Sequence, residues 1–134
     1  MVKIEDKNGK TLARYICKSS LQEQSLGFFS DDREQIQLGA WNYSQGKSLA
    51  RHYHNTVPRE FEVTGEVLIV MSGSILATIY DDNQFEVVQQ NVHSGDVLIL
   101  LSGGHGYEIL ENNTHVLEVK NGPYLGADID RTRF

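Results

Sequence analysis

The sequence contains a single cysteine among its 134 residues, so no disulfide can form within one chain. It carries 12 basic and 18 acidic side chains, which give a formal net charge of −6. A protein that grips nucleic acid through its phosphates needs a basic face, and this charge argues against that class of partner. The acidic balance instead suits an ordinary soluble domain that acts on small molecules or proteins.

Long apolar runs and an apolar leader are also missing. No apolar run is longer than that at residues 97–101, which is far too short to cross a bilayer. Residues 1–6 are already charged, whereas a secretion signal would place a basic stretch before an apolar one. We therefore expect a cytoplasmic protein with no membrane association.

The chain also lacks helical periodicity, because no stretch shows a sustained 3.6-residue period between capping residues. Glycine and asparagine instead divide it into short segments with strand-like patterns. The expected strands are residues 2–5, 11–16, 35–43, 48–54, 66–71, 74–80, 85–89, 96–101, 107–110 and 115–120. Residues 19–34 are expected to form a loop with one helical turn. Short strands without intervening helices predict an all-β protein, built as an antiparallel sandwich or barrel.

We expect one domain over residues 1–134, which is long enough to bury a core without disulfide or metal staples. Its core is expected at about residues 35–120. A hairpin at residues 1–18 precedes the core, and its Asn8-Gly9 pair suits a tight turn with positive φ. An irregular tail at residues 121–134 follows, and its aromatic and arginine side chains predict that it docks on the body or on a partner chain.

The residues with the clearest chemistry are three histidines and a glutamate. His52 and His54 alternate on an expected strand, so both imidazoles would point to the same face. Glu66 begins the next apolar run, and His105 follows later in the chain. Three imidazoles and one carboxylate are enough to enclose a divalent metal ion.

The spacing of these residues resembles the first motif of the cupin superfamily, whose members fold as small jelly-roll β-barrels. The motif is a glycine, five residues, His-x-His, a spacer, a glutamate, six residues and a glycine. Here it is matched by Gly46, His52, His54, Glu66 and Gly73.

The spacer between the histidine pair and the glutamate departs from the family pattern. It has eleven residues, 55–65, and is longer than the family's usual spacer. Either the loop between these strands is longer in this chain, or Glu60 or Glu62 takes the place of Glu66 as the carboxylate ligand.

The second cupin motif is matched less closely. Gly95 and Gly103 occupy its glycine positions, Leu101 replaces the proline, His105 comes one position early, and Ile109 stands where asparagine is usual. Together the two motifs extend the resemblance over about residues 35–120.

The resemblance implies a metal site made by His52, His54, Glu66 and His105. Iron, manganese, nickel, cobalt and zinc all suit these donors, and affinity alone does not choose among them. The resemblance further implies a metal-dependent dioxygenase or isomerase that acts on a small polar substrate, carbohydrate-derived or carboxylate, inside the barrel.

Two other functions remain open from the sequence. One is a binding or sensor module that holds a small molecule without turnover, and the other is a metal-free isomerase with a histidine as general base. Substrate contacts are expected from Arg59 and Glu60, on the loop that would overhang the barrel, and from Tyr107. We also expect a homodimer, because so many strands leave edges that need covering.

Overall fold

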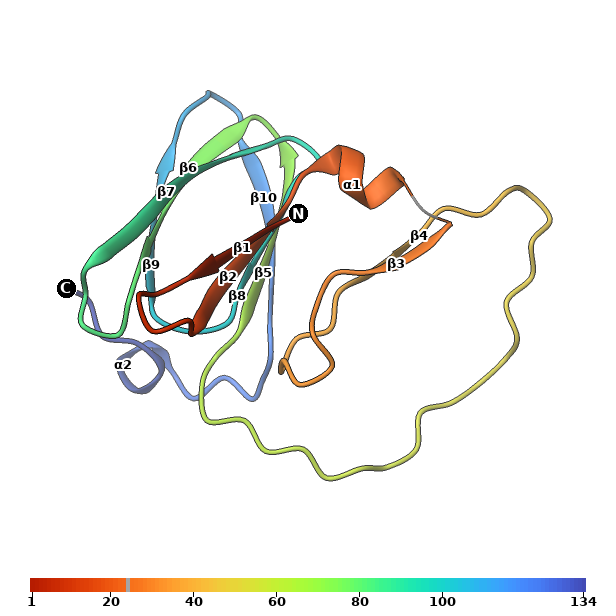
Figure 1. Ribbon diagram of the computed structural model, residues 1–134, viewed down its shortest axis with the longest axis horizontal. Coiled ribbons are helices and arrows are strands. Elements are labelled where there is room, and N and C mark those ends of the chain that lie inside the picture. Colours follow the sequence, from red (N-terminus) through yellow and green to blue (C-terminus); the bar gives the residue numbers. More distant parts are fainter. Residues whose placement is uncertain (24) are drawn as a thin grey trace.

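The computed structural model describes residues 1–23 and 25–134, and most of its elements are strands (Figure 1). The elements in chain order are β1 (Val2–Glu5), β2 (Thr11–Ile16), α1 (Lys18–Gln22), β3 (Leu26–Phe28), β4 (Gly39–Trp41), β5 (Glu66–Ser72), β6 (Ser74–Tyr80), β7 (Glu86–His93), β8 (Val97–Leu100), β9 (Gly104–Ile109), β10 (His115–Lys120) and α2 (Ala127–Asp130). The predicted all-β class is confirmed. No helix in the described ranges has both the length and the apolar character needed to cross a membrane.

Eight of the strands form two facing sheets, and every pairing is antiparallel. The larger sheet has the order β1-β2-β8-β5-β10, and the smaller has the order β7-β6-β9. Strands β3 and β4 form a separate two-stranded hairpin beside the sandwich. The described strands therefore make open sheets, and the edges β9 and β10 are not joined to each other.

Two apolar cores lie on opposite faces of the larger sheet. The first fills the space between the sheets and contains inward residues such as Leu68, Val70 and Ile79. The second lies on the outer face, where Ile99 and its neighbours are covered by the segment that carries α1 and β3. Strand β8 contributes to both cores, so all four of its residues are buried. This explains why residues 97–101 form a continuous apolar run instead of an alternating one.

The N-terminal hairpin has the predicted strand bounds, and β2 lies inside the main sheet between β1 and β8. Its turn differs from the predicted one, because Gly9 has a positive φ of 82° and Asn8 does not. The Asp6 carboxylate accepts hydrogen bonds from the backbone amides of Asn8 and Lys10, at 2.8 and 2.9 Å. A wider turn with a bulge at Glu5 results, in place of a two-residue primed turn.

The structure departs most from the prediction between residues 35 and 63. Of the strand expected at 35–43, only Gly39–Trp41 is extended and paired, with β3. Residues 48–54, all of which are described, have no regular secondary structure and are exposed. Alternating side chains are not sufficient for a strand, because the backbone also needs a neighbouring edge. Figure 1 shows this segment leaving the sandwich in a wide loop, away from every sheet edge of its own chain.

Candidate functional site

Three inward-facing polar side chains meet at one end of the sandwich. Glu66, the first residue of β5, is paired in register with Lys120 of β10. His105 lies on β9 opposite the buried Ile79 of β6, so its side chain also points between the sheets. Oε1 of Glu66 accepts a hydrogen bond from Lys120 Nζ at 2.8 Å, and Oε2 of Glu66 lies 3.4 Å from His105 Nε2.

The Glu66 carboxylate is buried, with 6% of the residue exposed. Its Oε1 is paired with Lys120, but its Oε2 has no hydrogen-bond partner within the described part of the chain. Leaving a buried acceptor unsatisfied disfavours the folded state by about 1–3 kcal/mol, and more for a charged group. An oxygen in this position therefore needs a cation or a proton donor.

Tyr107 and Glu118 extend this cluster along the same inward face. The Tyr107 ring stacks on the His105 ring with centroids 5.3 Å apart. Burial and the nearby carboxylates of Glu66 and Glu118 raise the pKa of the Tyr107 phenol, so it keeps its proton at neutral pH. The same two carboxylates raise the pKa of Lys120, which also lies 3.1 Å from Glu118. The cluster thus combines a fixed cation, two carboxylates, an imidazole and a neutral phenol.

A cavity of about 1640 Å³ opens beside the cluster. Its wall includes the end of the long segment, the β6–β7 turn, β9 and the C-terminal tail. The acidic side chains of the wall are Glu60, Glu62, Glu66, Asp81, Asp82, Glu118 and Asp130, and the basic ones are Arg59, Lys120, Arg131 and Arg133. Because carboxylates outnumber the permanent cations, the cavity favours a metal cation or an uncharged polar molecule over a multiply charged anion.

The C-terminal tail docks on the body, as predicted, and closes one side of the cavity. The ring of Phe134 packs edge-to-face on Tyr80, with centroids 5.2 Å apart. It also covers Gly104, where an added Cβ would lie 2.7 Å from the ring. Gly104, the residue before His105, therefore leaves room for the tail. A second contact holds the tail at α2, where Thr64 donates a hydrogen bond to Asp130 at 2.7 Å.

The structure places the other predicted ligands on the exposed segment. The rings of His52 and His54 lie edge-to-face, 5.3 Å apart, and Nδ1 of His52 is 3.1 Å from the carbonyl oxygen of Ala50. No group of three His, Cys, Asp or Glu side chains in the described residues is close enough to hold a metal ion. The structure therefore brings Glu66 and His105 together and leaves the histidine pair outside the cluster.

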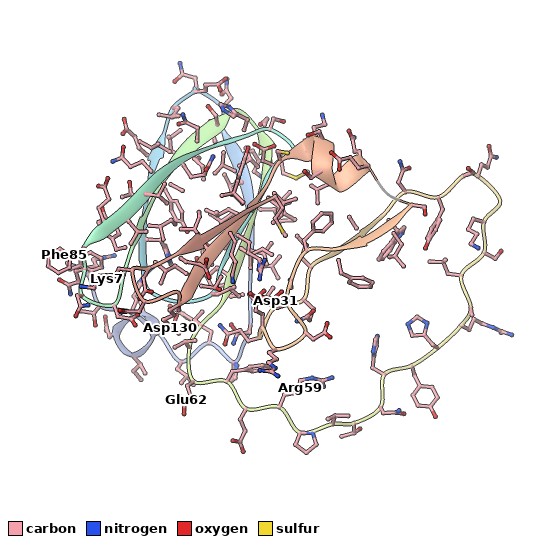
Figure 2. All side chains as sticks on the ribbon, in the orientation of Figure 1. Lys7, Asp31, Arg59, Glu62, Phe85 and Asp130 are labelled. Carbon is pink, nitrogen blue, oxygen red and sulfur yellow. The ribbon has the colours of Figure 1, made fainter. Side chains whose placement is uncertain are left out.

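The predicted substrate contacts divide in the same way. Tyr107 lies in the cluster, whereas Arg59 and Glu60 line the cavity from the exposed segment. Arg59 donates to the carbonyl oxygen of Val57 at 3.3 Å, and Figure 2 shows it at the same end of the molecule as Glu62 and Asp130. Of the three candidate carboxylates, only Glu66 is buried beside His105.

From the sequence, Tyr107 and Lys120 could each face either side of their strands, and Glu118 is not identified as a candidate. The β5–β10 register places Lys120 beside Glu66. The only signal in the sequence is that it lies two residues from Glu118, on the same face of an expected strand.

Comparisons of the chain with protein-family models, curated proteins and solved structures give no match. The geometry of this cluster and the motif spacing are therefore the features that bear on function.

Proposed function

We propose that the chain is a cupin-like jelly-roll protein that binds one divalent transition metal at Glu66 and His105, with His52 and His54 completing the site. The observation that carries the proposal is the buried Oε2 of Glu66, which lacks a hydrogen-bond partner among the described residues and faces His105 Nε2 at 3.4 Å. A carboxylate oxygen and an imidazole nitrogen facing the same space are typical ligands of iron, manganese, nickel, cobalt and zinc.

The motif spacing supports the same site. The His-x-His pair precedes the strand that begins with Glu66, and His105 lies on a strand of the opposite sheet. Two antiparallel sheets enclosing an apolar core are also what a jelly roll requires. The resemblance and the sandwich thus support one interpretation, a metal held between the two sheets.

The remaining side chains suit a small polar substrate. A bound divalent ion would supply Lewis-acid or redox chemistry, as an oxygenase or an isomerase needs. Lys120 pairs with one oxygen of Glu66 and fixes the carboxylate, and the other oxygen would bind the metal ion. Tyr107 retains its proton and can donate a hydrogen bond to a hydroxyl or carbonyl. The excess of carboxylates in the cavity supports a carbohydrate-derived substrate over a highly charged one.

The metal content of purified protein without a metal-binding tag tests the proposal. We expect about one iron, manganese, nickel, cobalt or zinc ion per chain, and a loss of at least about tenfold in metal affinity for Glu66→Gln. The double variant His52→Ala/His54→Ala should lose metal to a similar extent.

The matched control is the double variant His93→Ala/His115→Ala, which removes two exposed histidines on other strands and should keep the metal. Unchanged metal content in both ligand variants would contradict the proposed site.

One observation favours a second function. Lys120 already provides a cation 2.8 Å from Glu66, so the Glu66–His105 pair can act without metal, with His105 as general base and Glu66 orienting it. In that case metal-free protein would convert substrate, and His105→Gln would abolish turnover without altering metal content. Ligand binding without any turnover would instead indicate a binding or sensor module.

A further inference from the structure

The protomer exposes far more surface than a folded chain of its mass normally does. Its accessible surface is 9667 Å², whereas a compact monomer of 15.1 kDa exposes about 7,100 Å². The excess of about 2,600 Å² is as large as a substantial protein interface. We therefore expect part of this surface to be buried against a partner.

We define the exposed arm as residues 43–63, of which all but Tyr43 are exposed, and the β3–β4 hairpin adjoins it. The exposed large apolar residues there are Leu26, Phe28, Trp41, Leu49, Tyr53, Val57, Phe61 and Val63. A two-stranded hairpin alone in water is at best marginally stable, and so is an extended arm. These side chains therefore need a surface to pack against.

The sandwich offers such a surface between β9 and β10, which are edge strands of their sheets within the described chain. Ile109 points between the sheets but is 61% exposed, since nothing in the described protomer covers it. A cavity of about 200 Å³ lies beside it, lined by Leu68, Ile75, Tyr107, Ile109, Val116 and Glu118. On the outer face of β10, Leu117 and Val119 are also half-exposed.

We propose that the arm of one chain docks as an added strand on the β9 and β10 edges of a second copy, and that two chains exchange arms around a two-fold axis. An arm that adds to a sheet edge gains main-chain hydrogen bonds and buries alternate side chains. Reciprocal exchange also covers the edges that otherwise promote aggregation.

The path of the arm favours a second copy over its own sheet edge. In Figure 1 the outer bend of the arm lies on the opposite side of the sandwich from β9. If each chain buries its excess, the dimer interface totals about 5,000 Å², which is in the range of obligate dimers. A second copy therefore accounts for the exposed area with complementary surfaces that are already present.

Arm exchange would also bring the missing ligands to the site, a step that rests on the metal site proposed above. Alternate residues of a strand added beside β9 face inward with His105 and Tyr107. The partner's His52 and the partner's His54 share one such face. The exchanged arm would then complete the Glu66–His105 cluster, and Leu49 and Tyr53 would lie on its other face.

The mass of the full chain in solution tests the exchange without reference to metal. Light scattering should give about 30 kDa, twice the mass of one chain. The double variant Leu49→Asp/Tyr53→Asp should shift the protein to about 15 kDa, while Phe85→Asp, at an exposed aromatic residue next to β7, should stay dimeric. A monomeric wild type, or an arm variant that is folded and still dimeric, would overturn the proposal.

Mixing two variants, each lacking two of the four proposed metal ligands, tests whether the arm acts in trans. His52→Ala/His54→Ala keeps the cluster, and Glu66→Gln/His105→Ala keeps the arm ligands. Refolded together, they should form mixed dimers with one intact site, which bind about one metal ion per two chains. If each arm served its own chain, no dimer would contain an intact site.

The outcomes separate this inference from the proposed function. A metal-binding wild type whose mixed variants bind no metal would refute the exchange and leave the metal site standing. A dimeric wild type that takes up no metal, with an arm variant that turns monomeric, would support the exchange and refute the metal site.

Discussion

Tyr15 shows how a single side chain joins separate segments of this sandwich. Its hydroxyl donates to the buried carboxylate of Asp96 at 2.8 Å. Asp96 also accepts from the backbone amides of Lys18 and His93, at 2.8 and 3.0 Å. One carboxylate thus ties β2, the start of α1 and the β7–β8 turn together, and it cannot lose its partners without leaving buried groups unpaired.

The phenol of Tyr15 predicts a pH dependence of stability. Burial, followed by the hydrogen bond to Asp96, raises its pKa to about 12. In the unfolded chain the phenol ionises near its ordinary pKa of about 10. The stability that this group adds to the native state is therefore present in full below pH 10 and is lost between about pH 10 and 12. We expect Tyr15→Phe to flatten the stability profile in that range, by up to about 2 kcal/mol between the ends.

Urea unfolding of the wild type and of Tyr15→Phe at pH 9 and 11.5 would measure this difference. Tyr124→Phe is the matched control, because this exposed tyrosine should leave the profile unchanged. Parallel profiles for the wild type and Tyr15→Phe would contradict the assignment.

Among the elements, β2 is joined by an ion pair to the loop between β3 and β4, residues 29–38. Arg14 is 3% exposed, and its guanidinium bonds both carboxylate oxygens of Glu34 and reaches Asp31 at 2.6 Å. This contact holds the loop that places Ile36 and Leu38 on the second core. Glu34→Ala would leave a buried charge with only an exposed partner, and removing one member of a buried pair strongly disfavours the native state.

We expect Glu34→Ala to lower the free energy of unfolding by about 2–4 kcal/mol, measured by chemical denaturation. Asp82→Ala is the control, since its pair with Lys10 is largely exposed and should contribute less than about 1 kcal/mol. Equal effects of the two substitutions would rule out a special role for the Arg14–Glu34 pair.

Local pattern predicted some elements well and others poorly. β1, β2, β5, β6, β8 and β10 match their predicted bounds within a residue, because their apolar patterns and flanking turn residues are encoded nearby in the chain. Residues 48–54 alternate in the same way but form no strand, because a strand also requires an edge from distant residues. β9 begins at Gly104, earlier than predicted, since Gly104 pairs with Tyr80 of β6.

The candidate site shows the same limit. The sequence identified Glu66, His105 and Tyr107 as candidates, and the structure places these three together. Lys120 joins them through the β5–β10 register, which no local pattern gives. His52 and His54 remain a prediction, because their position relative to the site depends on where the arm docks.

At the scale of the whole molecule, the open edges make stability depend on concentration. If folding is completed by exchange of arms, dilution favours dissociation and the melting temperature falls with it. We expect the melting temperature to rise by several degrees between about 1 and 100 µM for the wild type. Leu49→Asp/Tyr53→Asp should melt at one lower temperature over the same range, as scanning calorimetry would show.

The central strand β8 restricts how the sequence can vary. Its four residues contact core on both faces, and two of them, Leu98 and Ile99, are fully buried. Sites of this kind accept only apolar side chains of similar volume. Both faces of the strand are packed, so a larger side chain would clash and a smaller one would leave a cavity. Sequence variation among natural variants should therefore be lowest in this strand and highest at surface positions such as Glu86 and Gln89 of β7. The residues that the fold constrains most would then be residues that take no part in the chemistry of the site.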